Sequence, residues 1–535
     1  MDATTADDRF IDWLFRAYVG TQEIHDLTPA EWKLNSLSAS LLVLVNDHIS
    51  AARVIDREQP GSPHFLVLTP ARWAEVRTGA LPVPDGLDRA PSRSWQRRPE
   101  HDETTTKLRQ ITLANFRCFE QTPFMFDPGL NVLIGRNGAG KSTVLDAIAA
   151  GLAGMIRPLQ LRLEDASSDA VSFSRDVRVT RIDKGETTTF EPQFPLRIEA
   201  QMQFFGDFLQ SGLQAIRQEN GAVFLGSSKN VSFLDLADVV RWAVQDGFDV
   251  TLPLIAYYGT DRTSRGGAAR PSTSESLSRL AGYEGCLRPS TDLSGMRAWF
   301  RRIELLALQD GRAPAVLEAT KRAILACLDG FDLVRYDARL DDLAARSSTT
   351  GLLLAFEQLS DGQRNMLGMI ADLAYRAATL NPHLGSDVTA QTPGVVLIDE
   401  LDLHLHPAWQ RRVLGDLTRV FPKVQFVVTT HSPQVLSTAP TGSVRLIDDD
   451  HRERRVDRTM GKDSNALLED VLGVPERPPE VKAALEELAR MIVDEALPEA
   501  RMKLAEIAAI LGEDDAEVTA GRWELKMAEG GDAAH

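Results

Sequence analysis

A glycine-rich segment at residues 135–142 has the composition needed to hold a chain of phosphate groups. It reads Gly-Arg-Asn-Gly-Ala-Gly-Lys-Ser, the pattern G-x-x-x-x-G-K-S, and lies between an expected strand at 131–134 and an expected helix. Glycines let backbone N–H groups turn toward phosphate oxygens, and the helix start adds its positive dipole end. Lys141 would reach the β and γ oxygens of ATP, and Ser142 would be a ligand of Mg²⁺. The other residues expected to bind the nucleotide here are Gly135, Asn137, Gly138, Gly140 and Thr143.

Two carboxylates follow a second apolar segment. Val395–Ile398 is followed directly by Asp399 and Glu400, which is typical of a buried parallel strand that delivers acids at its C-terminal edge. Alone, such a run is more often a plain buried strand, but a phosphate loop in the same chain reverses that preference. Asp399 would then complete the Mg²⁺ shell, and Glu400 would orient or deprotonate the attacking water. The two segments together predict an ATP hydrolase.

A second anion site is expected at residues 359–363, Leu-Ser-Asp-Gly-Gln, which precede a helix. The segment resembles the L-S-G-G-Q signature of ABC-type ATPases, with Asp361 in place of the first glycine. Ser360, Gly362 and Gln363 would contact nucleotide there. One chain has no use for two γ-phosphate sites on separate surfaces unless a second copy supplies the nucleotide. We therefore expect a head-to-tail homodimer, with a higher oligomer left open, in which Ser360 of one copy closes on ATP held by Lys141 of the other.

Two further positions follow the ABC pattern. Asp402, shortly after Glu400, resembles the D-loop aspartate, and His431 in Thr-Thr-His-Ser resembles the switch histidine that contacts the γ-phosphate. His431, Glu400 and Lys141 form the expected catalytic set. Arg117 resembles the adenine-side arginine of SMC and RecF-like heads. The Q-loop glutamine has three candidates, Gln193, Gln201 and Gln203.

These motifs need an α/β fold that brings them together, namely an ABC-type P-loop ATPase head of the SMC and RecF-like kind. The 219 residues from Lys141 to Ser360 are too many for a minimal transporter subunit and too few for long coiled-coil arms, which would also show heptads. We expect an N-terminal accessory domain at 1–80, a linker at 81–106, the first lobe of the head at 107–160, an inserted α+β or helical arm at 161–345, the second lobe at 346–450 and a helical C-terminal region at 451–535.

Composition restricts the partners and the compartment. With 59 Lys and Arg against 76 Asp and Glu, the net charge of −17 argues against coating nucleic acid or anionic membrane by bulk electrostatics. The cysteines, Cys118, Cys286 and Cys327, are far apart and form no C-x-x-C, so a disulfide framework and a cysteine zinc site are excluded and a cytoplasmic location is expected. No window approaches the ~18 apolar residues of a membrane span.

One region is locally basic. Residues 260–302 hold eight arginines and four acids, which a solvated loop face explains most simply. The alternative, functional interpretation is that the residues from Arg262 to Arg302 contact DNA, RNA or an acidic partner surface. The paired His404 and His406 could suggest a metal, and Glu31-Trp32-Lys33 resembles part of a nuclease motif, but we expect neither role. Only 104 residues follow His431, which disfavours an appended TOPRIM nuclease.

Four longer sequence segments resemble one particular family of ATPases. Residues 253–262, 359–364, 394–410 and 426–433 resemble the PtuA family, the ATPases of Septu and retron-linked anti-phage systems, and the likeness covers roughly 107–511. This resemblance implies a prokaryotic defence ATPase that associates with an HNH nuclease or a retron partner and controls it through its nucleotide state. A RecF- or SMC-like DNA repair or maintenance ATPase that clamps DNA is the alternative. A transporter subunit is disfavoured by the long insertion.

Overall fold

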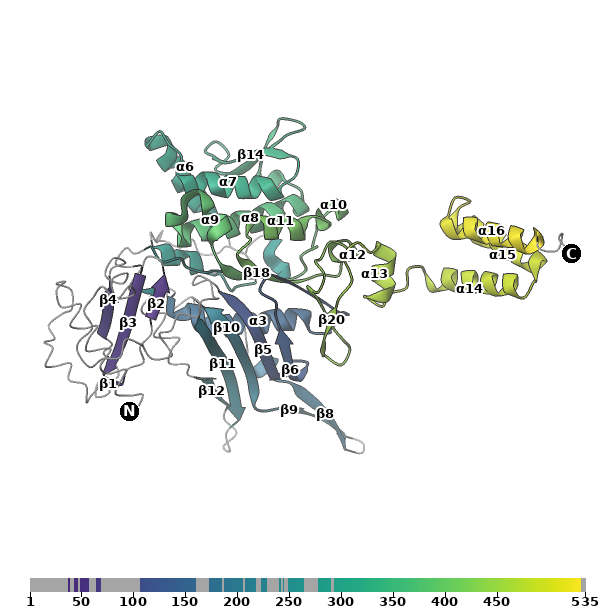
Figure 1. Ribbon diagram of the computed structural model, residues 1–535, viewed down its shortest axis with the longest axis horizontal. Coiled ribbons are helices and arrows are strands. Elements are labelled where there is room, and N and C mark those ends of the chain that lie inside the picture. The colour runs from purple at the N-terminus through teal and green to yellow at the C-terminus, as the bar shows by residue number, and fades with distance from the viewer. Residues whose placement is uncertain are drawn as a thin grey trace, which may run out of the picture. The chain divides into compact units, whose positions relative to one another are not determined.

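The computed structural model of the chain is shown in Figure 1. It describes residues 106–159, 173–184, 187–204, 207–217, 223–228, 240–241, 244, 249–263, 278–289 and 293–530, and the strands at 37–38, 43–46, 49–56 and 64–68. The described part of the chain divides into two compact units, one up to Met460 and one from Gly461 onward.

A six-stranded sheet forms the centre of the first unit, in the order β13-β17-β18-β7-β19-β20. Its members are β7 (Leu130–Ile134), β13 (Leu254–Tyr258), β17 (Gly394–Ile398), β18 (Val424–Thr429), β19 (Val444–Ile447) and β20 (Glu453–Val456). All neighbours pair in parallel except β20, which runs antiparallel to β19. Buried residues fill β7, β13, β17 and β18 throughout, as expected for parallel strands covered on both faces. The sequence-predicted strands are confirmed.

An antiparallel sheet lies beside this centre, in the order β12-β11-β10-β5-β6. Its strands are β5 (Lys107–Phe116), β6 (Phe119–Met125), β10 (Leu196–Phe204), β11 (Asp207–Arg217) and β12 (Val223–Ser228). Helix α3 (Lys141–Ile156) contacts β10 and β11 of this sheet and also β17 and β18 of the central one. The helix that follows the phosphate loop is therefore held between the two sheets.

The region expected as an inserted arm, 161–345, differs from the prediction. Strand β10 pairs with β5, and β13 pairs with β17, so both strands complete sheets of the head. The spacing between motifs gives the length of the interval but does not reveal which distant strands pair. The hairpin β8 (Val179–Lys184) with β9 (Thr187–Pro192) forms a two-stranded sheet of its own.

Helices cover the central sheet on the side away from the antiparallel strands, with α7, α8, α9 and α11 on one side of β18 in Figure 1. The longest, α8 (Asp361–Leu380), packs against α7 (Ala315–Cys327) and β13. The first unit also contains α6 (Ser294–Gln309), α9 (Val388–Gln391), α10 (Pro407–Gln410), α11 (Val413–Val420), α12 (Pro433–Leu436) and the three-stranded sheet of β14 (Phe331–Asp337), β15 (Asp342–Ser347) and β16 (Leu353–Ala355). The short helix α4 (Phe173–Asp176) lies instead beside the end of β5.

Near the N-terminus, β3 (Ile49–Asp56) pairs antiparallel with β1 (Leu37–Ser38), β2 (Val43–Asn46) and β4 (His64–Leu68). The four strands lie in the accessory domain expected at 1–80. The linker expected at 81–106, apart from its last residue, lies outside the described residues.

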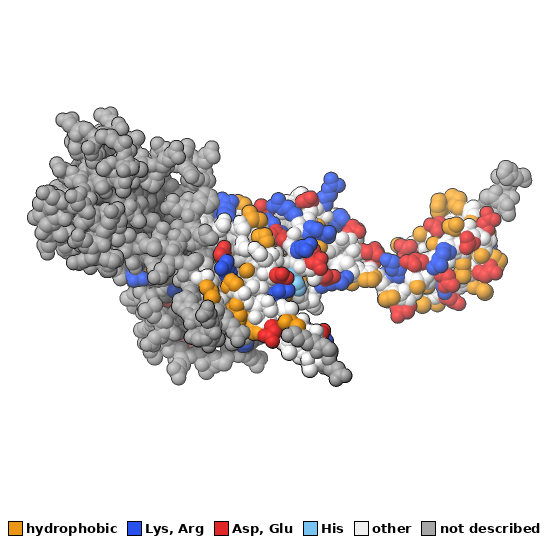
Figure 2. All heavy atoms as spheres, turned by 90° about the horizontal axis from the view of Figure 1, so that it is seen from below, with side chains coloured by type: hydrophobic (Ala, Val, Ile, Leu, Met, Phe, Trp, Pro, Cys, Tyr) orange, Lys and Arg blue, Asp and Glu red, His pale blue; other side chains and the backbone are white. Residues whose placement is uncertain are grey.

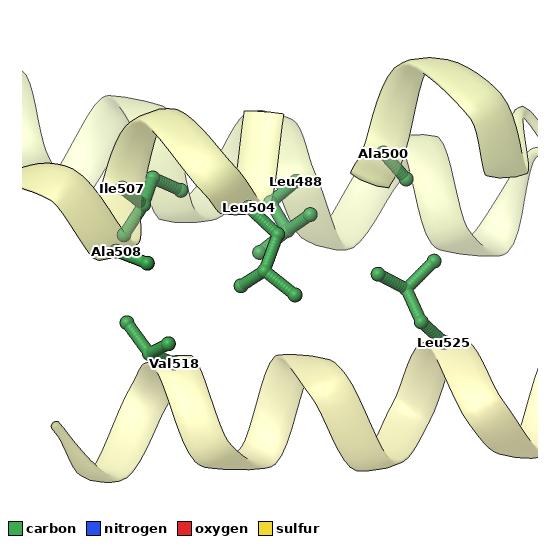
Figure 3. Close-up of a cluster of buried hydrophobic side chains, with 7 residues drawn as sticks. All are labelled: Leu488, Ala500, Leu504, Ile507, Ala508, Val518 and Leu525. Atoms are coloured by element: carbon green, nitrogen blue, oxygen red, sulfur yellow. The ribbon is translucent and has the colours of Figure 1, made fainter. Parts of the chain in front are cut away.

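The second unit consists of α13 (Ser464–Asp470), α14 (Pro479–Val493), α15 (Leu497–Leu511) and α16 (Ala516–Gly530). Figure 3 shows its core, in which side chains from three helices face one another: Leu488, Ala500, Leu504, Ile507, Ala508, Val518 and Leu525. The expected helical tail is confirmed, but β20 pairs with β19 and belongs to the head, so the helical unit begins later than residue 451. Its surface mixes charged with apolar side chains (Figure 2). Among the described helices, none is long and apolar enough to cross a membrane.

Candidate active site

The parallel register brings four loops to one edge of the central sheet. Tyr258 pairs with Ile398, Ile398 with Val428, and Thr429 with Leu133, so these strands end at nearly the same level. The carboxyl ends of parallel strands are where such sheets build binding sites. The loops that follow contain the phosphate loop, Asp399 with Glu400, and Thr430 with His431, as predicted. The fourth loop, Gly259 to Arg262 after β13, was not predicted to lie here.

The phosphate loop has the backbone conformation that its glycines predict. Gly138 and Gly140 have φ values of 85° and 105°, in the left-handed region that favours glycine. A Cβ on Gly135 would lie 2.5 Å from the carbonyl oxygen of Ile447, and one on Gly140 would lie 2.6 Å from the ring of Phe119. Helix α3 begins at Lys141, so its first N–H groups face the loop. The loop can therefore cradle phosphate oxygens with backbone amides.

Lys141 lies inside this loop. Its Nζ donates hydrogen bonds of 3.0 Å to the carbonyl oxygens of Gly135 and Arg136, and the residue is 7% exposed. Burial lowers the pKa of Lys141, while the charges of Asp399 and Glu400 oppose that shift. The ammonium is thus close to both predicted acids. In the same turn Ser142 is exposed and Thr143 half-buried, and Asn137 is exposed at the tip of the loop.

One threonine fixes the acidic loop. The hydroxyl of Thr429 donates to Oδ1 of Asp399 at 2.6 Å and accepts from the backbone N–H of Glu400 at 2.7 Å. Glu400 has φ 46°, a left-handed conformation that is uncommon for a residue with a side chain. The contacts of Thr429 therefore hold a strained turn in place, and sequence reasoning missed this residue because a threonine at a strand end carries no motif.

The oxygen donors present fit Mg²⁺. Mg²⁺ prefers one or two protein oxygens together with phosphate and water oxygens, and the carboxylate of Asp399 and the hydroxyl of Ser142 are such donors. Asp399 is 5% exposed and is already oriented by Thr429.

Asp402 and His431 come from neighbouring loops at the same edge. The hydroxyl of Thr430 donates to Oδ1 of Asp402 at 2.5 Å, which ties the end of β18 to the segment after the acids. Burial lowers the pKa of His431, and so does the charge of Lys141, whereas Asp402, Glu400 and Asp399 act in the opposite direction. His431 therefore lies within electrostatic range of the predicted catalytic set and favours its neutral form.

The predicted signature segment begins α8. The Ser360 hydroxyl accepts from the Gln363 N–H at 3.4 Å, and the Gln363 side chain accepts from the Ser360 N–H at 3.0 Å, which is a capping box. Ser360 and Asp361 are exposed. A Cβ on Gly362 would lie 2.5 Å from the carbonyl oxygen of His404. The helix start thus presents an exposed hydroxyl, while its second residue packs directly on the chain that follows Asp402.

Arg117 is linked to the helix that follows the phosphate loop. Its guanidinium donates to Asp146 on α3 at 2.6 Å and to Asp176 at 2.7 Å, and Asp146 also accepts from the Tyr257 hydroxyl at 2.8 Å. The side chain is 31% exposed. The adenine-side role of Arg117 stays a prediction that this position supports.

The three Q-loop candidates lie on the antiparallel sheet or next to it. Gln203 accepts a hydrogen bond from Arg109, Gln193 donates to the carbonyl of Glu191, and Gln201 is exposed on β10. The loop beside Asp399 is instead the one after β13.

The arginine-rich region is less available than its composition suggested. Arg262 is 8% exposed, and Arg279 donates to the backbone carbonyl of Leu380 at 2.7 Å. Arg297 pairs with Asp342 and Glu357, and Arg301 with Asp341. Arg262, Arg279, Arg297 and Arg301 therefore have partners within the chain, and Arg265 and Arg270 lie outside the described residues.

Comparisons with known proteins agree with this arrangement. A family model described as an AAA domain matches residues 110–294, and another, an AAA domain whose description names the AbiEii toxin and a type IV TA system, matches residues 257–437. The chain is 25% identical over 490 residues to the "Retron Ec83 probable ATPase" of Escherichia coli, covering 78% of this chain and 86% of that protein. It is 24% identical over 404 residues to the Septu protein PtuA of Bacillus thuringiensis, covering 72% and 90%.

A solved SMC head bound to the C-winged helix domain of ScpA matches with 16% identity and a TM-score of 0.40, covering 66% of this chain and 97% of that one. The phosphate loop, the acidic strand end and the histidine loop meet at one sheet edge, and the matches to the retron ATPase and the Septu protein cover 78% and 72% of this chain. The chain is therefore an ATP hydrolase with a P-loop head of the AAA type, and its sequence is similar to those of a retron ATPase and a Septu protein.

Proposed function

We propose that this chain binds Mg-ATP between two head-to-tail copies and uses the bound and hydrolysed states to control a partner nuclease of the HNH type in anti-phage defence. The observation that carries the proposal is the division of the nucleotide-binding groups. Lys141 and Asp399 are buried at one sheet edge, whereas the hydroxyl of Ser360 is exposed at the start of α8, as a group serving a second copy must be.

The residues of one head have complementary roles in this proposal. The phosphate loop and Lys141 bind the triphosphate, Ser142 and Asp399 hold Mg²⁺, and bound Mg²⁺ neutralises charge on the transferred phosphoryl group. Glu400 accepts a proton from the attacking water, and His431 in its neutral form donates a hydrogen bond toward the γ-phosphate. Ser360 of the second copy adds its hydroxyl and the N–H groups of a helix start. Without that copy the site lacks its final anion contacts.

The names of the homologues, a retron ATPase and a Septu protein, support a place in phage defence. The alternative, a RecF- or SMC-like ATPase that clamps DNA, needs a basic surface on the head. The intramolecular contacts of Arg262, Arg279, Arg297 and Arg301 weaken that alternative.

The proposal predicts that an HNH nuclease is encoded beside this gene, and reconstitution of the chain with that nuclease tests it. Linear duplex DNA is incubated with the nuclease alone and with both proteins under ATP, ADP or no nucleotide. The proposal expects co-purification and a cleavage rate that depends on the nucleotide. A complex whose cleavage rate is the same under all three conditions would contradict the gating role, and salt-dependent DNA binding by the chain alone would favour the clamp.

A further inference from the structure

We propose that Arg262 is a positioning residue that fixes the acidic loop and couples it, through Asn365, to the signature helix α8. The inference rests on the proposed function, because the coupling matters only if Ser360 on that helix meets the nucleotide of a second copy.

The guanidinium of Arg262 links the end of β13 to the end of β17. Its Nη1 donates to the carbonyl oxygens of Asp399 at 2.5 Å and Gly259 at 2.9 Å, and its Nη2 donates to the carbonyl oxygen of Glu400 at 2.7 Å. Arginine suits this task because its planar fork presents several donors in fixed directions. Glu400 has φ 46°, and its carbonyl is one of the three that the fork holds. The direction of the Glu400 side chain is therefore set by Arg262 as well as by Thr429.

The charges around Arg262 support the same positioning role. Arg262 is 8% exposed. Burial lowers its pKa to about 10, against the opposing charges of Asp399, Glu400 and Asp402, so the guanidinium stays charged at neutral pH. A buried cation beneath three carboxylates offsets their mutual repulsion.

The remaining donor of Arg262 reaches the signature helix. Its Nε donates to Oδ1 of Asn365 at 2.8 Å, and Nδ2 of Asn365 donates to the carbonyl oxygen of Leu403 at 2.8 Å. Asn365 is 5% exposed and lies in the second turn of α8, five residues after Ser360. One buried amide thus links the helix that carries Ser360 to Arg262 and to the segment after Asp402.

These contacts give a physical route between two sites of a dimer. When Ser360 meets the phosphate of a second copy, a small movement of α8 is transmitted through Asn365 to Arg262 and to the carbonyls of Asp399 and Glu400. The geometry of the acids in one copy then depends on whether its own signature helix is engaged. Each head therefore hydrolyses ATP faster when its own Ser360 also closes on a partner's nucleotide.

Arg279 provides the matched control. It is a half-buried arginine whose pKa is lowered by burial, and it donates to backbone carbonyls, including that of Leu380 at 2.7 Å, at the opposite end of α8. Arg279→Lys therefore measures how the loss of guanidinium contacts to backbone carbonyls affects the stability of the fold. Arg262→Lys removes the corresponding contacts beside Asp399 and Glu400.

The test measures kcat and the Kd for ATP in the full chain, for Arg262→Lys, Arg279→Lys and Asn365→Ala, each alone and combined with Ser360→Ala. We expect Arg262→Lys to lower kcat by roughly 10²-fold, as a misplaced catalytic group does, with little change in the Kd for ATP. Arg279→Lys should leave kcat close to that of the parent.

The double variants test the coupling. The effects of Asn365→Ala and Ser360→Ala on kcat should be non-additive, while those of Arg279→Lys and Ser360→Ala should add.

Equal kcat in Arg262→Lys and Arg279→Lys would overturn the inference, and so would additive effects of Asn365→Ala and Ser360→Ala. If Arg262→Lys fails to fold, as judged by its melting temperature, the Asn365 and Ser360 pair decides alone. A parent chain without ATP turnover would instead contradict the proposed function.

Discussion

Gly362 and His404 pack so closely that any side chain on the glycine would meet the His404 carbonyl oxygen, at 2.5 Å from the Cβ. The contact joins the start of α8 to the chain that follows Asp402, and backbone forms the opposing surface. A glycine inside a helix is otherwise unfavourable, since alanine favours the helix by about 0.5–1 kcal/mol. Close approach therefore explains the glycine at this position.

We predict that Gly362→Ala lowers kcat roughly tenfold or more while ATP still binds, because the clash displaces the signature helix and not the phosphate loop. Gly415→Ala is the control, since its Cβ in α11 would have nothing within 4 Å. Steady-state ATPase rates and ATP titrations check this. If both alanine variants turn over ATP equally, the contact has no catalytic role.

Glu400→Gln should abolish turnover without weakening nucleotide binding. The amide keeps the size of the carboxylate but cannot accept the proton of the attacking water, while the phosphate loop is untouched. The expected loss of kcat is at least about 10²-fold. Glu524→Gln, at an exposed position of α16, controls for the change of charge. Phosphate release that continues at the parent rate would show that another group is the base.

The acid dependence of stability should contain a contribution from His431. Its folded pKa lies below the ordinary value of 6.5, so between these two values the unfolded chain binds more protons than the folded chain. His431 therefore contributes stability that is complete above pH 6.5 and is lost as the pH falls below it. Melting temperatures at pH 7.5 and 5.5 should differ less for His431→Gln than for the parent chain. An identical difference in both proteins would contradict this assignment.

The helical C-terminal unit should depend on its own small core. Leu504 is 6% exposed among the side chains of Figure 3, and Leu504→Ala should cost about 2–5 kcal/mol of local stability. Met502 on the same helix is 66% exposed, so Met502→Ala is the matched control. Hydrogen exchange in the full chain should show faster exchange across α14 to α16 for the first variant alone. Faster exchange in the central sheet as well would mean that the two units unfold together.

Much of the site was predictable because its residues follow buried strands. Short apolar runs such as that of Val395–Ile398 are typical of strands covered on both faces, and parallel strands bring their C-terminal ends to one edge. The phosphate loop, Asp399, Glu400 and His431 therefore had to converge once the runs were read as a parallel sheet.

Arg262 and the pairing of β10 with β5 were not predictable in the same way. The sequence around Arg262 is rich in arginine, and local composition suggests a solvated surface, whereas its burial is set by the position of β13 beside β17. Likewise, residue Ile198 pairs with Leu113 across a long interval of chain that no local pattern connects. Both features depend on non-local strand order.

Mixing two inactive variants tests most directly whether the ATP site is shared between copies. Glu400→Gln lacks the base of its own head, and Ser360→Arg blocks the signature that its head offers to a second copy. In a head-to-tail dimer of one chain of each kind, one site joins an intact Glu400 to an intact Ser360. Random pairing makes half of the dimers mixed, each with one restored site, so the rate should rise on mixing to at most about a quarter of the parent rate. A mixture that is no faster than the average of the two separate variants would contradict the shared site.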